Sequence, residues 1–239
     1  MDPHGEALWA YFEGDADAEL IVRREDGHEA RLPARYFYRG PAEFTGIEKA
    51  AIERCVAPVL DVGAGTGLHS LALQHKGIRV TAIDISAQAI TIMSGRGVAD
   101  THCADLFEYE GGSFQTLLML GHGIGMVETL AGLDRFLVHA HGVLTESGQI
   151  VLDSLDVRAT DDPKNLAYLE ANQRAGRYLG ETRVQFEHGG KKGPYCGWLH
   201  VDPTTLEAHA SRTGWTCEVI LEQDQGDYLA RLVKISGSI

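Results

Sequence analysis

The stretch Val59-Leu60-Asp61-Val62-Gly63-Ala64-Gly65-Thr66-Gly67 decides the fold. Its apolar start predicts a buried strand over residues 58–62, and Leu68, Leu71 and Ala72 then recur at helical spacing. Glycines between the two elements permit the dihedral angles of a tight turn, and they let a nucleotide-like ligand approach the backbone. A tight turn that binds no ligand is the alternative interpretation of the same residues.

Outward from this stretch, short apolar runs alternate with helical spacing from Ala57 to about Ser154. We predict further strands over residues 78–83, 99–104, 114–120 and 149–152, a helix that Ser86 caps and Gly95 and Gly97 end, and a helix that carries Leu130, Leu133, Leu137 and Ala140 inward. Strands that alternate with helices indicate an α/β fold. We expect a Rossmann-like, seven-stranded, mostly parallel sheet with helices on both faces.

Additions flank this core. Alternating residues 19–32 around Asp26-Gly27 predict an N-terminal hairpin. It leads into the aromatic cluster Tyr36-Phe37-Tyr38, and we call this segment the lid. A small β insertion after the fifth strand is expected from strands over residues 183–187 and 195–201, joined by a loop over residues 189–193. At the C-terminal end, Thr204 and Glu207 have capping-box spacing, Gly214 ends the helix, and strands over residues 215–221 and 228–235 follow.

These parts predict one domain over residues 1–239. It contains an N-terminal hairpin and lid (1–56), a cofactor-binding core (57–154), a substrate-side insertion (155–201), and a C-terminal helix with an antiparallel strand pair (202–239).

Composition narrows the partners. The 239 residues are 44% hydrophobic, contain no run long enough to span a membrane and begin without a secretory signal, so we expect a soluble, cytoplasmic protein. A net charge of −13 disfavours a nucleic-acid substrate, because phosphate backbones are repelled. The four cysteines lack Cys-x-x-Cys spacing and are expected to be reduced thiols.

Asp84 follows the second predicted strand, 17 residues after Gly67. An acid at this point accepts hydrogen bonds from both hydroxyls of a ribose. Capping of the next helix is the alternative role, although Ser86 is available for it. A nicotinamide-dependent dehydrogenase has a similar turn, but its fingerprint places two residues between the last two glycines, whereas only Thr66 lies there.

With these motifs, the chain resembles the class I S-adenosylmethionine-dependent methyltransferases. The resemblance extends as an element order from Tyr36 to the C-terminus, and the specific motifs lie between Val59 and Leu120. It implies that the glycine turn packs on the methionine part of the cofactor, Asp84 binds the ribose and Asp105 binds the adenine. The implied cofactor-binding residues are Arg39, Asp61, Gly63, Ala64, Gly65, Gly67, Asp84, Ile85, Asp105, Leu106 and Leu120. The implied product is S-adenosylhomocysteine.

Methyl transfer is an in-line displacement, so alignment matters most, and a base is needed when the acceptor is a hydroxyl or a protonated amine. His122, between Gly121 and Gly123 after the fourth strand, is the main candidate base. Tyr38 in the lid and His200 in the insertion are secondary candidates, each with packing as the alternative role. No metal site is predicted, because His139 and His141 diverge on a helix.

Several functions stay open from sequence. The main prediction is transfer of a methyl group from S-adenosylmethionine to a small molecule by a monomer or homodimer. The alternatives are a nicotinamide-dependent dehydrogenase and a noncatalytic S-adenosylmethionine-binding protein; an aminopropyl transferase and an arsenite methyltransferase have weaker support, because an acidic pocket and a cysteine cluster are missing from the sequence pattern. The acceptor and its reacting atom are not specified.

Overall fold

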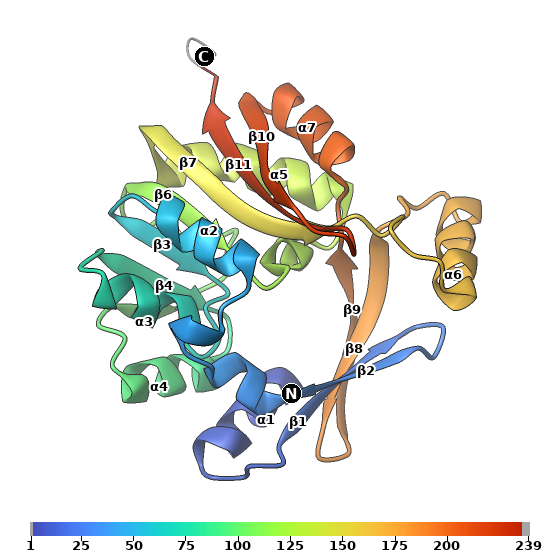
Figure 1. The fold of residues 1–239 in the computed structure, drawn as a ribbon, viewed down its shortest axis with the longest axis horizontal. Coiled ribbons are helices and arrows are strands. Elements are labelled where there is room, and N and C mark those ends of the chain that lie inside the picture. The colour runs from blue at the N-terminus through green and yellow to red at the C-terminus, as the bar shows by residue number, and fades with distance from the viewer. Residues whose placement is uncertain (1, 236–239) are drawn as a thin grey trace. The chain divides into compact units, whose positions relative to one another are not determined.

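The computed structural model describes residues 2–235 (Figure 1). The chain divides into two compact units: unit 1 contains residues 2–110 and 184–196, and unit 2 contains residues 111–183 and 197–235. None of the helices in these residues is both long and apolar enough to cross a membrane.

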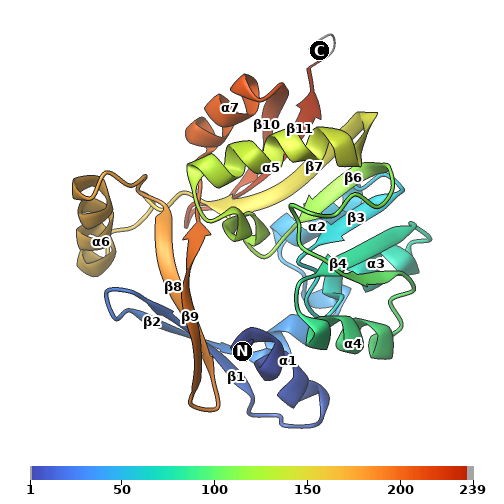
Figure 2. The same ribbon diagram turned by 180° about the vertical axis from the view of Figure 1, so that it is seen from behind.

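Unit 1 contains the glycine turn. Its elements are α1 (Pro3–Phe12), β1 (Glu19–Arg24), β2 (Glu29–Pro33), the 3₁₀ turns η1 (Ala34–Tyr38) and η2 (Pro41–Glu43), α2 (Gly46–Arg54), β3 (Val59–Val62), α3 (Leu68–His75), β4 (Val80–Asp84), α4 (Ala87–Arg96) and β5 (Thr101–Cys103). Strand β3 is buried at every residue, as its apolar sequence predicts, and β3, β4 and β5 are parallel. Helices α3 and α4 lie against β4 (Figure 2).

Unit 2 contains a second run of strands and helices. Its elements are β6 (Phe114–Met119), the 3₁₀ turn η3 (Gly123–Val127), α5 (Leu130–Val143), β7 (Leu144–Leu155), α6 (Pro163–Arg174), α7 (Pro203–Arg212), β10 (Trp215–Glu222) and β11 (Asp227–Lys234). Strands β6 and β7 are parallel, whereas β7, β11 and β10 pair antiparallel, so the predicted final strand pair is confirmed. In α5, Leu133, Leu137 and Ala140 are buried as predicted.

Two further strands, β8 (Glu181–His188) and β9 (Lys191–Leu199), form the inserted hairpin. The strand order is β10-β11-β7-β6-β3-β4-β5 in the larger sheet and β2-β1-β8-β9 in the smaller sheet. The predicted α/β class with a seven-stranded, mostly parallel sheet is therefore confirmed.

The smaller sheet joins two hairpins that are far apart in the sequence. The predicted N-terminal hairpin is confirmed as β1 and β2, with Gly27 at φ +88° in its turn. Residues 21–24 of β1 pair antiparallel with residues 184–187 of β8. The expected five-residue loop of the insertion is wrong: Gly189 and Gly190, at φ +55° and +77°, form a two-residue turn, and Lys191 already belongs to β9.

Helix α1 is absent from our sequence prediction, although Asp2 caps it and Pro3 begins it. It packs on α4 because both helices carry a glycine at the contact. A Cβ atom on Gly5 would lie 2.4 Å from Ser86 Oγ, and one on Gly95 would lie 2.9 Å from Phe12 Cζ. Gly95 therefore serves the packing of the helices and does not end α4, contrary to the prediction.

The ends of the other helices confirm one prediction, correct another and reveal two helices that were not predicted. Of the two glycines predicted to end α4, only Gly97 does so, with a left-handed φ of +94°. The start of α7 is set by Asp202, whose side chain accepts from Thr205 N–H, and not by the predicted Thr204 capping box. Helices α2 and α6 were not predicted, although Thr45 with Glu48 and Asp162 with Pro163 are start signals of the expected kind.

Candidate functional site

The glycine turn after β3 requires glycine at three positions. Gly63, Gly65 and Gly67 have φ angles of +67°, +57° and +76°, in the left-handed region that side chains disfavour. Their surroundings differ: Gly63 is exposed, Gly65 is half-buried and Gly67 is buried. A Cβ atom on Gly65 would meet nothing closer than 4.0 Å, whereas one on Gly67 would lie 2.6 Å from Val98 Cγ2. The turn therefore packs inward at Gly67 and presents open backbone at Gly63 and Gly65.

This difference in surroundings predicts that alanine destabilises the protein more at Gly67 than at Gly65. Gly67→Ala is expected to destabilise the protein by about 2–4 kcal/mol, from left-handed strain plus overpacking. Gly65→Ala is expected to cost about 1 kcal/mol, from strain alone. Urea unfolding of the two variants measures this. Equal losses of stability would contradict the inward packing of Gly67.

Most N–H groups of the turn are used within the turn. Gly63 and Ala64 both donate to Ile83 O, at 2.9 and 3.1 Å, Gly65 donates to Asp84 Oδ2 at 2.9 Å, and Gly67 donates to Ala64 O at 2.8 Å. A pyrophosphate needs free N–H donors and no adjacent anion. The turn therefore suits a ligand without phosphate groups, which disfavours a dinucleotide.

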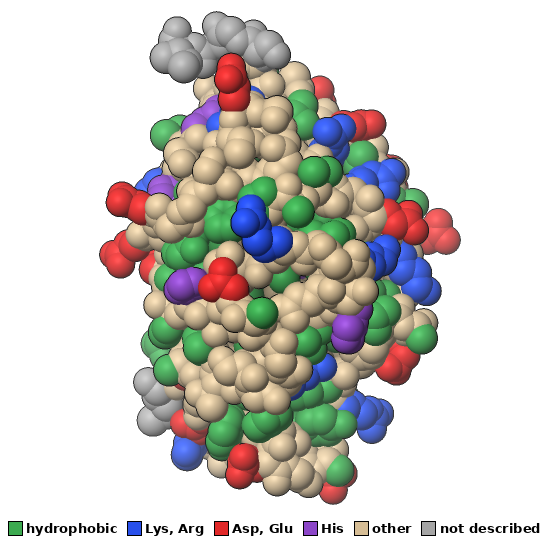
Figure 3. Space-filling view, turned by 90° about the vertical axis from the view of Figure 1, so that its left-hand side faces the viewer, with side chains coloured by type: hydrophobic (Ala, Val, Ile, Leu, Met, Phe, Trp, Pro, Cys, Tyr) green, Lys and Arg blue, Asp and Glu red, His purple; other side chains and the backbone are tan. Residues whose placement is uncertain are grey.

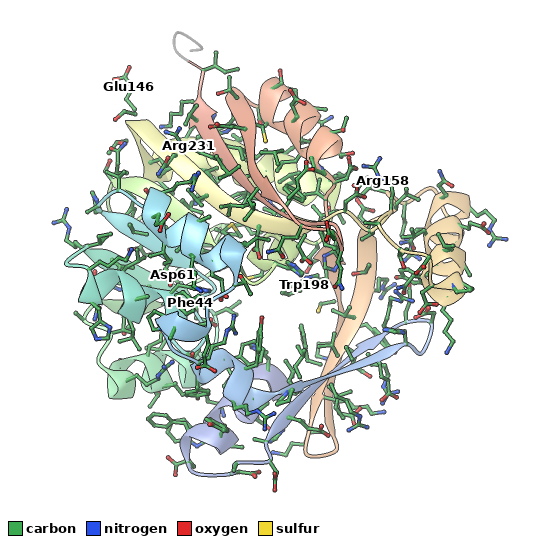
Figure 4. All side chains as sticks on the ribbon, in the orientation of Figure 1. Phe44, Asp61, Glu146, Arg158, Trp198 and Arg231 are labelled. Atoms are coloured by element: carbon green, nitrogen blue, oxygen red, sulfur yellow. The ribbon has the colours of Figure 1, made fainter. Side chains whose placement is uncertain are left out.

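Asp61, labelled in Figure 4, is buried beneath the turn, at 2% exposure. Its Oδ2 accepts a hydrogen bond from Ser70 Oγ at 2.7 Å, which ties β3 to α3. Burial raises the pKa of Asp61, while nearby His69 and the Ser70 hydrogen bond act in the opposite direction. The contact with Ser70 supports a role of Asp61 in orienting the turn.

Asp84 ends β4 and is half-buried. Its two carboxylate oxygens accept from Gly65 N–H and Ser86 N–H, each at 2.9 Å. A carboxylate has about four acceptor positions, so about two remain for other donors. The helix-cap alternative does not hold, because Ser86 Oγ accepts from Ala89 N–H and caps α4 itself.

A cavity of about 310 Å³ lies beside Ile85, and we call it the Ile85 cavity. It is lined by Asp2, Pro3, His4, Ile85, Ser86, Phe186, Gly193, Pro194 and Cys196. The Ile85 side chain is 73% exposed, an unusual state for a large apolar group. The ring of His4 lies 5.7 Å from those of Phe37 and Phe186, and burial lowers the pKa of His4 despite nearby Asp84 and Asp2. A largely apolar wall of this kind suits a planar ring.

Asp105 and Leu106 follow β5 in the same unit. Asp105 is half-buried and its Oδ1 accepts from Phe107 N–H at 2.7 Å, so the carboxylate is held in a turn. Leu106 is 9% exposed. Within unit 1, the predicted residues of the turn and of the ends of β4 and β5 thus lie at the carboxyl ends of three adjacent parallel strands, where α/β sheets bind ligands.

Glu48 is a buried charge that sequence reasoning missed. It is 5% exposed on α2, forms an ion pair with Arg39 and is hydrogen-bonded to His69 Nε2 at 3.0 Å. Burial alone would raise its pKa, but hydrogen bonds from His69 and Arg39 outweigh burial and hold the pKa of Glu48 at about 2. The capping-box spacing of Thr45 and Glu48 marks the helix start, but nothing in the sequence pairs Glu48 with Arg39.

The lowered pKa of Glu48 predicts how the stability of the fold depends on pH. Glu48 stabilises the fold fully above its ordinary pKa of 4.5, and this contribution falls as the pH drops toward about 2. We expect Glu48→Gln to lower the free energy of unfolding by on the order of 3 kcal/mol near pH 7 and by less at pH below about 4. Urea unfolding across this range measures the gap. Glu53→Gln, an exposed change on the same helix, is the control; a pH-independent gap would contradict the assignment.

The side chains of the lid candidates Tyr38 and Arg39 both contact other residues of the protein. Tyr38 donates its hydroxyl to Leu8 O at 2.7 Å, and burial raises its pKa to about 12. Arg39 pairs with Glu48, and its guanidinium lies 3.7 Å from the centre of the Tyr36 ring. These contacts explain both residues by packing and charge pairing, so neither enters our proposal.

His122 lies in unit 2, two residues after the buried Leu120 that follows β6. Its backbone is left-handed, at φ +58°, and its N–H donates to Asp153 Oδ1 at 2.9 Å. Its Nε2 lies 2.8 Å from Asp227 Oδ1 on β11. Burial alone would lower the pKa of His122, but the Asp227 hydrogen bond and the Asp153 charge outweigh burial and raise it above 6.5. Asp227 has no sequence signal that links it to His122.

His200 lies beside His122, just beyond the end of β9, with the ring centres 5.5 Å apart and the rings nearly perpendicular. Trp198, labelled in Figure 4, packs its ring on Gly125, where a Cβ atom would lie only 2.2 Å from the indole. Reciprocally, a Cβ atom on Gly197 would lie 2.6 Å from Glu128 Cβ. Two glycines thus interlock the His122 loop with the end of β9. Tyr195 lies in unit 1 and is 42% exposed.

Across residues 2–235, no group of three or more His, Cys, Asp or Glu side chains is arranged to hold a metal ion. All four cysteines are free thiols.

Comparison with known proteins identifies the family. A family model described as a methyltransferase domain matches residues 59–148. The crystal structure of an S-adenosylmethionine-dependent methyltransferase from Bacteroides fragilis, in complex with S-adenosylhomocysteine, is 31% identical to this chain. The match covers 98% of this chain and 95% of that chain, with a TM-score of 0.86. No curated protein matches the sequence.

Two more distant structures share the fold. The CcbJ methyltransferase from Streptomyces caelestis is 13% identical, with 82% of this chain and 94% of that chain covered and a TM-score of 0.60. The sugar N-methyltransferase KedS8 from Streptoalloteichus is 16% identical, with 84% and 92% covered and a TM-score of 0.54. From the Bacteroides match and the methyltransferase domain, the chain belongs to the S-adenosylmethionine-dependent methyltransferases and is an enzyme that uses this cofactor.

Proposed function

We propose that this enzyme transfers the methyl group of S-adenosylmethionine to a small molecule whose acceptor atom carries a proton, such as a hydroxyl or a protonated amine. The observation that carries the proposal is His122, whose side chain is held by Asp227 and whose backbone is held by Asp153. A placed imidazole is needed for acceptors that must lose a proton, and a thiolate or carboxylate acceptor has no use for it.

The residues of unit 1 fit the cofactor. Asp84 has about two unused acceptor positions for the ribose hydroxyls. Ile85 and Leu106 offer apolar surface to the adenine ring, with Asp105 available to its amino group. Gly63 and Gly65 offer open backbone to the methionine part. The Bacteroides relative, crystallised with S-adenosylhomocysteine, supports the same choice of ligand.

The chain's own residues have two tasks in the reaction. When bound, S-adenosylmethionine supplies a methyl group on a positively charged sulfur. The site must align the acceptor with that methyl group, and His122 accepts the proton that the acceptor atom releases. The positive charge that appears on the imidazole is then balanced by Asp227, 2.8 Å away.

Charge supports a small acceptor over a nucleic acid. The protein has 34 acidic and 21 basic residues, a net charge of −13. On the face shown in Figure 3, Lys and Arg side chains are scattered among Asp and Glu side chains. A nucleic-acid-binding face gathers basic side chains along the phosphate path.

The test has two stages. Calorimetric titration with S-adenosylhomocysteine is expected to show saturable binding, whereas NAD is expected not to bind; the opposite result would indicate a dehydrogenase. Radiolabelled S-adenosylmethionine is then offered with panels of small hydroxyl, amine, thiol and carboxylate compounds. Label is expected in hydroxyl or amine acceptors, and labelling of thiols or carboxylates alone would reject the proposed acceptor class.

A further inference from the structure

The loop around His122 holds a strained residue in one place. A non-glycine residue at φ +58° is uncommon, because the left-handed region brings its side chain close to the backbone. Asp153, 6% exposed on β7, accepts the N–H of this residue at 2.9 Å. Because Asp227 holds the side chain from β11 as well, two carboxylates on adjacent strands fix one residue, Asp153 through its backbone and Asp227 through its imidazole. Strain that is held in this way is typical of functional sites.

We propose that Asp227 is a positioning residue that sets which nitrogen of His122 accepts the proton of the methyl acceptor. This inference rests on the proposed function. An ionised carboxylate is an acceptor only, so a hydrogen bond of 2.8 Å between Asp227 Oδ1 and His122 Nε2 requires the hydrogen on Nε2. In neutral His122 the lone pair is therefore on Nδ1, and Nδ1 is the proton acceptor.

Asp227 is suited to remain ionised. The hydrogen bond from His122 lowers its pKa, and the nearby imidazole of His200 acts in the same direction against burial. The charged and titratable groups around His122 thus come from three elements: Asp153 on β7, Asp227 on β11, and His200 beyond β9. The two acids, Asp153 and Asp227, favour the protonated His122 that forms when the acceptor loses its proton.

The site is also open to a ligand. The His122 side chain is 32% exposed, and the Asp227 side chain is 29% exposed. Among residues 2–235, the His122 ring makes its contacts through Nε2 and through the face toward His200, and none of these contacts involves Nδ1. An acceptor can therefore reach the ring while Asp227 retains its hydrogen bond.

One proton moves from the acceptor to His122 in each methyl transfer. The acceptor atom forms a bond to the methyl carbon, and the electron pair of the methyl–sulfur bond goes to sulfur. The proton of the acceptor goes to His122 Nδ1, which gives an imidazolium paired with Asp227. Solvent then takes the proton, and the neutral Nε2–H form returns.

The test reads the ring nitrogens directly. Nitrogen-15 NMR of the full-length protein is recorded from about pH 5 to pH 9 for the wild type, Asp227→Asn and Asp134→Asn, with His122→Asn used to assign the signals. Asparagine tolerates the left-handed backbone and so preserves the loop. Asp134 pairs with His209 Nδ1 at 2.9 Å in the same unit, so Asp134→Asn is a matched control.

In the wild type we expect neutral His122 to carry its hydrogen on Nε2 and to titrate above 6.5. Asp227→Asn is expected to lower the midpoint by about one pH unit and to populate the Nδ1–H form, whereas Asp134→Asn leaves both unchanged. An unchanged midpoint and an unchanged hydrogen position in Asp227→Asn would overturn the inference.

Enzyme kinetics distinguish a positioning role of Asp227 from a purely structural role. With any acceptor that the enzyme methylates, Asp227→Asn is expected to lower kcat at least about 10-fold and to shift the rising limb of the pH profile to lower pH, with KM for S-adenosylmethionine unchanged. A wild-type pH profile and kcat in this variant would reject the role. If S-adenosylhomocysteine fails to bind the wild type, the proposed function fails, and the NMR result still decides whether Asp227 sets the hydrogen position of His122.

Discussion

Replacing Asp84 with asparagine is expected to weaken binding of S-adenosylhomocysteine at least about 100-fold, the largest loss of affinity from any single substitution at the site. Hydrogen bonds to a charged group contribute about 1.5–3 kcal/mol each, and two ribose hydroxyls depend on this carboxylate. The amide of asparagine also turns a donor toward Gly65 N–H or Ser86 N–H, which both now donate to Asp84. Calorimetric titration measures the change.

The control for this prediction is Asp100→Asn, in the same unit. Asp100 is hydrogen-bonded to Thr81 and His102, so its substitution removes an acid near β4 without touching the glycine turn. We expect wild-type affinity in that variant. Full affinity in Asp84→Asn, with an intact fold by circular dichroism, would remove the ribose role from Asp84.

Replacing His122 with asparagine is expected to lower kcat about 100- to 10,000-fold while leaving the affinity for S-adenosylhomocysteine unchanged. A positioned base contributes rate accelerations of that size, and asparagine accepts the left-handed backbone without offering a basic nitrogen. Initial rates with radiolabelled S-adenosylmethionine and a methylated acceptor measure kcat, and calorimetry measures the affinity.

His75→Asn serves as the control, because His75 is exposed at the end of α3. It is expected to keep wild-type kcat. A His122→Asn enzyme with normal turnover would show that alignment alone suffices and that the acceptor needs no base.

The fold was predictable where the sequence signals are local. Strand β3 is a short apolar run, and the glycines after it adopt the positive φ angles that their spacing predicts. The hairpin at Asp26-Gly27 and the cap at Ser86 follow equally local rules. Helix α1 was missed because Gly5 counts against a helix, and because its packing on α4 joins residues that are far apart in the sequence.

The site was predictable only in part. The glycines and acids of unit 1 occupy neighbouring strand ends because parallel strands bring their carboxyl ends to one edge. The partners of His122 were not predictable, since Asp153 and Asp227 lie 31 and 105 residues away and reach it only through the pairing of β7 with β11. The ion pair of Glu48 with Arg39 was not predictable either, because the spacing of two charged residues in the sequence does not show whether they are buried together.

The pairing of β1 with β8 has a consequence for how the protein is made. Arg24 and Val184 are register partners, so 160 residues must be synthesised after Arg24 before its neighbour on the smaller sheet leaves the ribosome. Until then, one edge of β1 is open to other strands. Arg23 and Arg24 place charge on that edge, and charge at an open edge discourages pairing with a second nascent chain. A chain whose synthesis stops before Glu181 therefore keeps one edge of its first hairpin unpaired.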